Sequence, residues 1–245
     1  KNILASDYLP NADALLTISI LNLFQGESDE ALGITLVAGL QANGSFADFV
    51  NVGQLQSVFA KFSENVQQKA KALHTQLEHA DAELIERFTR LEPNMDRGDV
   101  GRGRRIFFGE AAACSTCHPI GNEGGNFGPD LTTIGLVRSG HDLLEAIMFP
   151  SSSFVPDFTP YIVETTDDEV YIGIIARESA EGIVLKTGVG EERYIPRSMI
   201  AAMTTSPTSI MPEGLDSGMT DDELLDLMSF LRSLNDSQWL LPKDE

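Results

Sequence analysis

The sequence predicts a mainly α-helical protein, with a helical N-terminal part and a small antiparallel β meander inserted in its second part. Three observations predict this fold class. Apolar residues return at intervals of three and four up to about residue 96, which is the period of a helix. Residues 161–196 change to short β-branched runs separated by turn-forming residues. A last helix is expected from Asp221 to Leu234, because Thr220 and Glu223 have the spacing of a capping box.

Charge and length exclude several classes of protein. The chain has 245 residues, with 17 Lys plus Arg against 37 Asp plus Glu and a formal net charge of −20. This charge argues against nucleic-acid binding, which selects for clustered basic residues, so a basic partner is expected instead. The longest apolar run, residues 14–21, is far shorter than the roughly 20 residues of a membrane-spanning helix. No membrane span is therefore expected.

The first part of the chain is predicted to be a repeat-like domain of four or five antiparallel helices, residues 1–96. Its longest helix carries a narrow apolar seam: Val66, Ala70, Leu73, Leu77, Ala80, Leu84 and Phe88. Pro93 and Gly98 interrupt the helical pattern, which predicts a boundary near residue 96. The second domain, residues 97–245, holds 11 basic and 24 acidic residues against 6 and 13 before it. The second domain is thus the more acidic.

In the second domain a short helix is expected over residues 100–108, then a Gly-rich loop and a helix over residues 141–148. Three strands follow, over residues 161–166, 170–175 and 182–187.

One motif carries the chemistry. Cys114-Ser115-Thr116-Cys117-His118 is a Cys-x-x-Cys-His sequence, the attachment signature of c-type haem. Two thiols on one helical turn can each form a thioether with a haem vinyl group, and the following imidazole then lies under the iron. From the composition, a chance occurrence has a probability on the order of one in ten thousand.

Other uses of the two cysteines each lack a component. An iron–sulfur cluster or a structural zinc site needs about four ligands, and the chain has no third cysteine. A thioredoxin-like pair lies at a helix start directly after a strand. The pair in this chain instead follows Gly109-Glu110-Ala111-Ala112-Ala113, which has no strand pattern.

Residues 97–245 resemble a class I cytochrome c, and more narrowly the haem-binding domain at the end of large secreted planctomycete proteins. The residues that carry the resemblance are Gly98-Asp99, Gly103, Phe107, Cys114 to His118, Gly128-Pro129-Asp130-Leu131, Phe149-Pro150-Ser151, residues 209–215 and the last helix. The resemblance implies a class I cytochrome c fold, with the β meander as an insertion, and one covalent haem c. Residues 1–96 weakly resemble the helical segment found upstream in such proteins, which often follows a sugar-dehydrogenase-like propeller.

His118 is the expected proximal iron ligand, and its second ring nitrogen needs an acceptor that fixes the ring. The resemblance implies that the carbonyl of Pro129 is this acceptor. It also implies that Arg138, after the Leu-x-x-Ile-Gly stretch, approaches a haem propionate, although a plain surface arginine is an equal alternative.

The sixth ligand is chosen from seven methionines. Met211 matches the methionine of the family's Met-Pro-Glu-Gly-Leu motif and lies in a loop stiffened by Pro212. Met219 is the runner-up; it precedes the Thr220 cap, where a hydrophobic staple residue belongs. A distant histidine is a third alternative.

The expected function is electron transfer by an electron carrier that is not itself an enzyme. A thioether ligand favours Fe(II) and raises the potential over bis-histidine ligation, which suits electrons arriving from a dehydrogenase module or a redox protein with a basic docking surface. Haem attachment to reduced thiols places the protein in the periplasm or beyond. The chain begins at Lys1 without a leader, so we expect any signal peptide to have been removed or to lie outside this sequence.

The interval of 93 residues between His118 and Met211 contains the meander, which is expected to stand beside the haem and restrict one approach route. Two other functions stay open. A haem enzyme or gas sensor would have an open sixth position, and a partner-binding module would carry the haem as a passenger.

Overall fold

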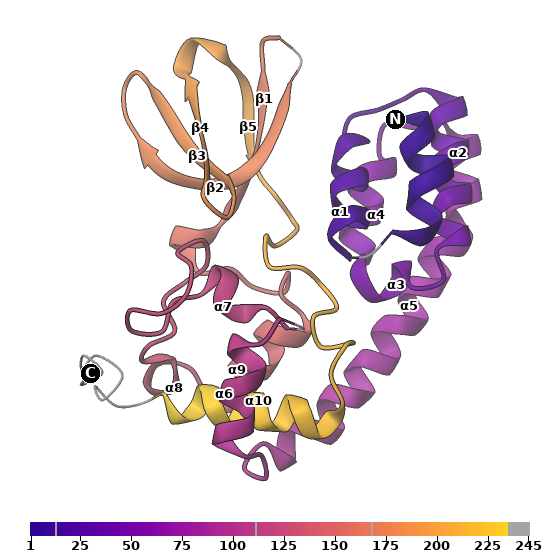
Figure 1. The fold of residues 1–245 in the computed structure, drawn as a ribbon. Helices are drawn as coiled ribbons and strands as arrows, with labels where there is room; N and C mark the ends of the chain where they lie inside the picture. Colours follow the sequence, from indigo (N-terminus) through magenta and orange to yellow (C-terminus); the bar gives the residue numbers. More distant parts are fainter. Residues whose placement is uncertain (13, 111, 168, 235–245) are drawn as a thin grey trace. The chain divides into compact units, whose positions relative to one another are not determined.

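A computed structural model describes residues 1–12, 14–110, 112–167 and 169–234 of the chain (Figure 1). They form two compact units. The first unit contains residues 1–87 and 212–217, and the second contains residues 88–211 and the chain from residue 218. The domains expected from the sequence are 1–96 and 97–245. The boundary between the two units lies earlier, between Arg87 and Phe88, inside one continuous helix, α5.

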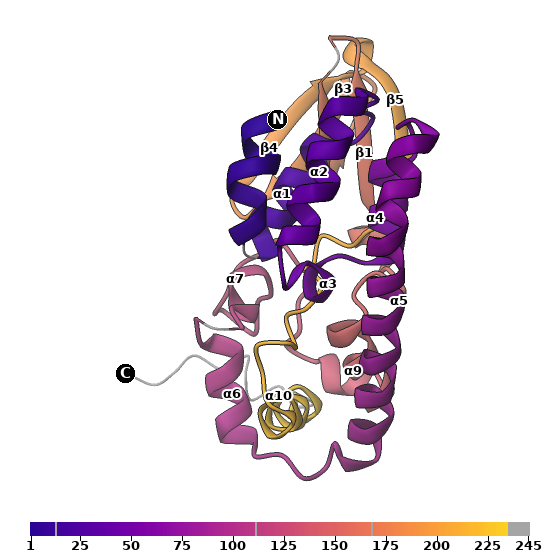
Figure 2. The same ribbon diagram turned by 90° about the vertical axis from the view of Figure 1, so that its right-hand side faces the viewer.

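The first unit is built from helices, as the apolar periodicity predicts. Its elements are η1 (Leu4–Tyr8), η2 (Leu9–Asn11), α1 (Ala14–Leu23), α2 (Glu30–Ala42), α3 (Phe46–Phe49), α4 (Val52–Phe59) and α5 (Glu64–Leu91). Short side chains cap two of them: Asp29 accepts from the Leu32 NH at the start of α2, and Asn51 accepts from the Gln54 NH at the start of α4. The 28-residue α5 is the longest helix described (Figure 2).

The apolar seam of α5 is buried over only part of its length. Val66, Ala70, Leu73 and Leu77 are fully buried in the core of the first unit, whereas the three seam residues after them are half-buried. The last of these, Phe88, belongs to the second unit, where its ring lies 5.9 Å from that of Phe149 between centroids. The seam therefore changes its packing partner toward the end of the helix.

The second unit begins with helices whose positions agree closely with those predicted. Its helical elements are η3 (Glu92–Asn94), α6 (Val100–Phe108), α7 (Cys114–Cys117), α8 (Ile134–Val137), α9 (Gly140–Met148), η4 (Pro156–Phe158), η5 (Arg197–Met199) and α10 (Asp221–Ser233). The capping box expected at Thr220 and Glu223 is present and begins α10. A second capping box, of Ser139 and Asp142, begins α9.

Helices α6 and α10 cross in close contact. A Cβ atom at Gly103 would lie 2.0 Å from the backbone oxygen of Asp226, so only glycine allows this approach. Phe107 packs on Phe230 with ring centroids 5.7 Å apart. The buried carboxylate of Asp226 accepts hydrogen bonds from the Arg102 guanidinium at 2.5 and 2.8 Å. Gly103 and Phe107, two of the residues that carry the resemblance, thus lie in the contact between these two helices.

A five-stranded antiparallel sheet occupies the middle of the second unit's sequence. Its strands are β1 (Pro160–Thr165), β2 (Val170–Glu178), β3 (Gly182–Gly188), β4 (Glu191–Pro196) and β5 (Ile200–Thr205), in the order β4-β3-β2-β1-β5. Val163, Ile183, Leu185 and Ile195 form its buried core. The fifth strand pairs with β1, so the sheet is more than a meander of consecutive neighbours.

The predicted fold class is therefore wrong. A mainly α protein with a class I cytochrome c fold and a small inserted meander was expected, but the structure mixes helices with a five-stranded sheet. The two strands missing from the prediction are the edges of that sheet. β4 exposes four of its six residues and β5 reads Ile-Ala-Ala-Met-Thr-Thr, so neither carries the alternation of a half-buried strand.

Within the described residues, no helix has both the length and the apolar character needed to cross a membrane.

Candidate functional site

The two cysteines and His118 lie on and just after one short helical turn. Cys114 and Cys117 are the first and last residues of α7, and the His118 NH donates to the Cys114 carbonyl at 3.0 Å. Ala113 enters the turn with a φ of 50°, the left-handed conformation that few non-glycine residues adopt. Both thiols are free and half-buried. The turn thus presents two thiols and an imidazole within five residues.

The ring of His118 is fixed by a backbone carbonyl. Nδ1 of His118 lies 2.9 Å from the carbonyl oxygen of Pro129. Since a carbonyl can only accept, Nδ1 carries the hydrogen and Nε2 keeps its lone pair. Burial lowers the pKa of His118 below its usual value, and the Pro129 carbonyl opposes this only in part. The imidazole is therefore neutral and held in one orientation.

Glycines let the following loop lie directly against the turn. A Cβ atom at Gly125 would lie 1.9 Å from the Thr116 carbonyl oxygen, and one at Gly128 would lie 2.6 Å from Cε1 of His118. The NH groups of Phe127 and Gly128 both donate to the Cys117 carbonyl, at 3.1 and 2.8 Å. The loop is therefore held to the turn by backbone contacts.

The thiols are protonated at neutral pH. Burial raises the pKa of Cys114 to about 11 and raises that of Cys117 as well. A redox-active or metal-binding pair needs thiolates and a lowered pKa. In the part of the chain that the structure describes, no three His, Cys, Asp or Glu side chains are grouped to hold a metal ion. The raised pKa values of the two thiols do not favour a disulfide exchanger.

The residues present fit a c-type haem in three respects. Two neutral thiols lie on one turn, the neighbouring imidazole keeps Nε2 available, and its other nitrogen has the carbonyl partner that axial histidines require. Gly128 also lies directly against the imidazole ring. A side chain at this position would collide with the ring.

Met211 lies half-buried in the loop that follows the sheet. Its NH donates to Oγ of Ser209 at 3.1 Å, and the Ser209 NH donates to Oγ of Ser151 at 3.0 Å. Two segments singled out in the sequence, residues 149–151 and 209–215, are thus brought together. The pairing of Met211 with His118 through an iron stays a prediction.

The other methionines have different surroundings. Met148 and Met228 are fully buried, as expected for core residues, and Met199 and Met203 pack against the core of the sheet. Met219, the runner-up ligand, is half-buried immediately before the Thr220 cap.

Arg138 lies exposed just after α8, where its NH donates to the Ile134 carbonyl at 2.9 Å. Its role toward a propionate stays a prediction.

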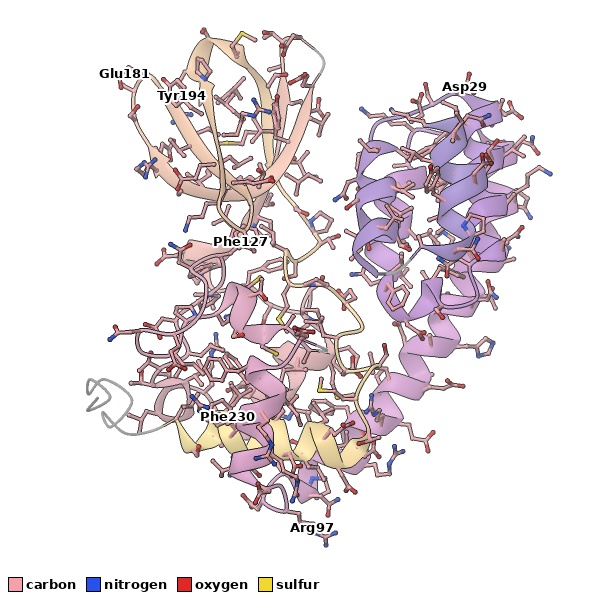
Figure 3. All side chains as sticks on the ribbon, in the orientation of Figure 1. Asp29, Arg97, Phe127, Glu181, Tyr194 and Phe230 are labelled. Atoms are coloured by element: carbon pink, nitrogen blue, oxygen red, sulfur yellow. The ribbon has the colours of Figure 1, made fainter. Side chains whose placement is uncertain are left out.

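The sheet contacts the loop that follows the Cys-x-x-Cys-His motif. Nζ of Lys186, on β3, donates to the Asn126 carbonyl at 2.9 Å. Phe127 and Lys186 line two adjoining clefts of about 430 and 330 Å³ with residues of β2, and Figure 3 shows Phe127 where the sheet meets the loops below it. This contact places β3 beside the loop after the motif. That the strands stand beside a haem and restrict one approach route stays a prediction.

Several supporting residues escaped the sequence analysis. They are Gly125, Phe127 and Lys186. The Gly124-Gly125 pair beside the motif was a usable signal for close backbone approach. The others act over long sequence distances and leave no local pattern.

No protein-family model and no curated protein matches the chain.

Proposed function

We propose that the protein is an electron carrier with one covalently bound haem c. Cys114 and Cys117 would hold the macrocycle and His118 the iron, with Met211 as the second axial ligand. When bound, the haem would supply one-electron transfer at the iron. The observation that carries the proposal is the contact of 2.9 Å between His118 Nδ1 and the Pro129 carbonyl, directly after a turn that bears two thiols.

The chain's own residues have two tasks in this proposal. The Pro129 carbonyl keeps the His118 ring in one tautomer and orientation, which makes Nε2 a better donor. A thioether from Met211 would raise the potential, since it favours the reduced iron. Neither residue performs bond chemistry, so the protein is a carrier.

The proposed partner is a dehydrogenase module or redox protein with a basic docking surface. The net charge of −20 supports this, because opposite charges accelerate encounter and salt screens them. Electron-transfer rates with such a partner should fall as salt is added. The proposed location is the periplasm or beyond, where thiols receive haem.

The axial ligand is tested by absorption spectra of the full chain with haem attached. The oxidised wild type should show a methionine-to-iron charge-transfer band that Met211→Ala abolishes and Met219→Ala keeps. A band that survives Met211→Ala and disappears in Met219→Ala would move the assignment to Met219. A wild type without any such band would favour a haem enzyme or gas sensor with an open sixth position.

A further inference from the structure

The segment directly after Met211 belongs to the other compact unit. Residues 212–217 group with the helical residues 1–87, while the chain on either side groups with the second unit. Only Pro212 separates Met211 from Glu213, so their Cα atoms can be at most roughly 7.6 Å apart. Whatever fixes this segment also restricts the position of Met211.

Glu213 is held at the start of α4. Its Oε1 accepts from Nδ2 of Asn51 at 2.8 Å, while Oδ1 of Asn51 caps α4 by accepting from the Gln54 NH at 2.8 Å. The Asn51 amide is thereby fixed through both of its polar atoms, and its contact to Glu213 is correspondingly well defined.

Gly214 lies in direct backbone contact with α3. Its φ is +73°, and a Cβ atom would lie 1.8 Å from the carbonyl oxygen of Asp48. Any other residue would be excluded both by this conformation and by the lack of space. The backbone of the segment is therefore in close contact with α3 at Gly214.

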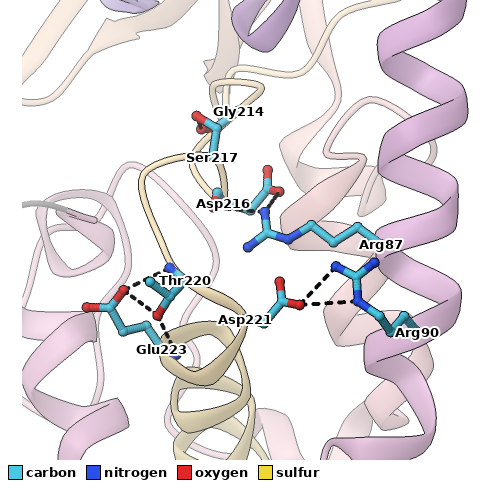
Figure 4. A network of polar contacts seen from close by, with 8 residues as sticks. All are labelled: Arg87, Arg90, Gly214, Asp216, Ser217, Thr220, Asp221 and Glu223. Atoms are coloured by element: carbon cyan, nitrogen blue, oxygen red, sulfur yellow. Dashed lines mark hydrogen bonds and ion pairs between the residues drawn. The ribbon is translucent and has the colours of Figure 1, made fainter.

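Asp216 is the most buried residue of the segment, and it forms an ion pair with Arg87 of α5. Nη1 of Arg87 donates to Oδ2 of Asp216 at 2.8 Å and to its backbone oxygen at 3.1 Å (Figure 4). The Asp216 side chain is 2% exposed and that of Arg87 is 18% exposed. Arg87 thus donates to both the side chain and the backbone of Asp216, and the pair is buried. Such a pair holds the segment in one position.

A second arginine one turn along α5 offers an internal comparison. Arg90 bonds the Asp221 carboxylate at 2.9 Å, but both side chains are largely exposed, at 56% and 40%. Asp221 begins α10 behind the Thr220 capping box (Figure 4). Arg90 thus contacts the helix after the segment, and Arg87 contacts the segment itself.

We propose that Arg87, Asp216 and Glu213 are positioning residues for Met211, so that the helical unit fixes the sixth ligand of the haem iron through residues 212–217. This inference rests on the proposed haem function. It gives the helical unit a role, since loosening its hold would lower the fraction of iron bound by Met211 and with it the reduction potential.

The test compares Asp216→Asn and the milder Glu213→Gln with Arg90→Gln as matched control, all in the full chain with haem attached. Amide hydrogen exchange of residues 212–217 should rise about tenfold or more in Asp216→Asn, because loss of a buried pair costs more than the 1.4 kcal/mol that a factor of ten represents. The methionine-to-iron band should weaken and the potential should fall. Glu213→Gln should shift both measurements in the same direction by less, and Arg90→Gln should leave both at the wild-type value.

Each contrary outcome is distinct. Unchanged exchange in Asp216→Asn would overturn the inference, because the ion pair would not hold the segment. Faster exchange with an unchanged band and potential would also overturn it, while leaving the haem function intact. A wild type that carries no haem, or whose band survives Met211→Ala, would overturn the proposed ligation itself and the inference with it.

Discussion

The loop around His118 and the loop around Met211 are held in opposite ways. His118 is fixed by Pro129, 11 residues away, and its neighbours bond through backbone groups of residues 113–131. The segment after Met211 is fixed by Arg87 and Asn51, which lie 129 and 162 residues from their partners.

This difference teaches that the two loops are fixed by different kinds of contact. Contacts between near neighbours close small loops at low entropic cost, so the His118 side can form from its own segment. The segment after Met211 depends instead on contacts with residues that are distant in the sequence. In the proposed carrier, the proximal ligand is thus a local property and the distal ligand a long-range one.

The largest expected effect comes from removing the long-range anchor. Arg87→Gln would leave the buried Asp216 carboxylate without its charged partner, which should cost about 3 kcal/mol of unfolding free energy. Urea unfolding followed by circular dichroism measures this. A loss no greater than that of Arg90→Gln would show that the two loops are not anchored differently.

The local side is broken most directly at Gly125. Gly125→Ala places a Cβ atom 1.9 Å from a backbone oxygen, and the resulting backbone shift should cost about 1–3 kcal/mol. Gly218→Ala, in the other loop, is the matched control because nothing lies within 4 Å of its added Cβ. Equal thermal stability of the two variants would contradict the close packing around the motif.

The sequence predicted the local features well. α6, α9 and α10 were located within one residue of their ends because caps and apolar periodicity are properties of neighbouring residues. The Cys-x-x-Cys-His turn was visible for the same reason. The contact of His118 with the Pro129 carbonyl is present, but it was expected only from the resemblance and not from a local pattern.

The long-range features could not be read in this way. β5 forms by pairing Val163 with Met203 and Ile162 with Thr204, a pairing that no local pattern announces. Likewise nothing near Asp216 indicates that its partner is Arg87. The wrong fold class has this cause: edge strands are defined by their neighbours in space.

Lowering the pH should affect two aspartates in opposite directions. Hydrogen bonds from Arg102 lower the pKa of Asp226 in the folded protein. Its contribution to the free energy of unfolding is therefore present above pH 3.8, the ordinary pKa of the group, and is lost as the pH falls through the lower folded-state pKa. Burial raises the pKa of Asp216 in the folded protein, although Arg87 opposes this. Its contribution to the free energy of unfolding therefore becomes more favourable as the pH falls from that raised pKa toward 3.8.

Asp226→Asn should therefore lose its stability deficit against the wild type in acid, a change of about 1 kcal/mol given the exposure of Arg102. The deficit of Asp216→Asn should instead grow. Unfolding free energies measured across the acid range check this, and parallel curves for both variants would refute the assignment.

The smallest expected effect is that of Arg90→Gln. Its ion pair with Asp221 is largely exposed, so its loss should cost about 0.2–1 kcal/mol and should shrink further in high salt. Thermal unfolding at low and high salt measures this. A loss as large as that of Arg87→Gln would erase the contrast between the two arginines.

The central claim is tested most directly by the intact mass of the full chain, exported to a periplasm that contains the haem-attachment machinery. The wild type should gain the mass of one haem under denaturing conditions, and Cys114→Ser combined with Cys117→Ser should gain none. A wild type with the mass of the bare polypeptide would contradict the claim, as would a gain that survives loss of both cysteines.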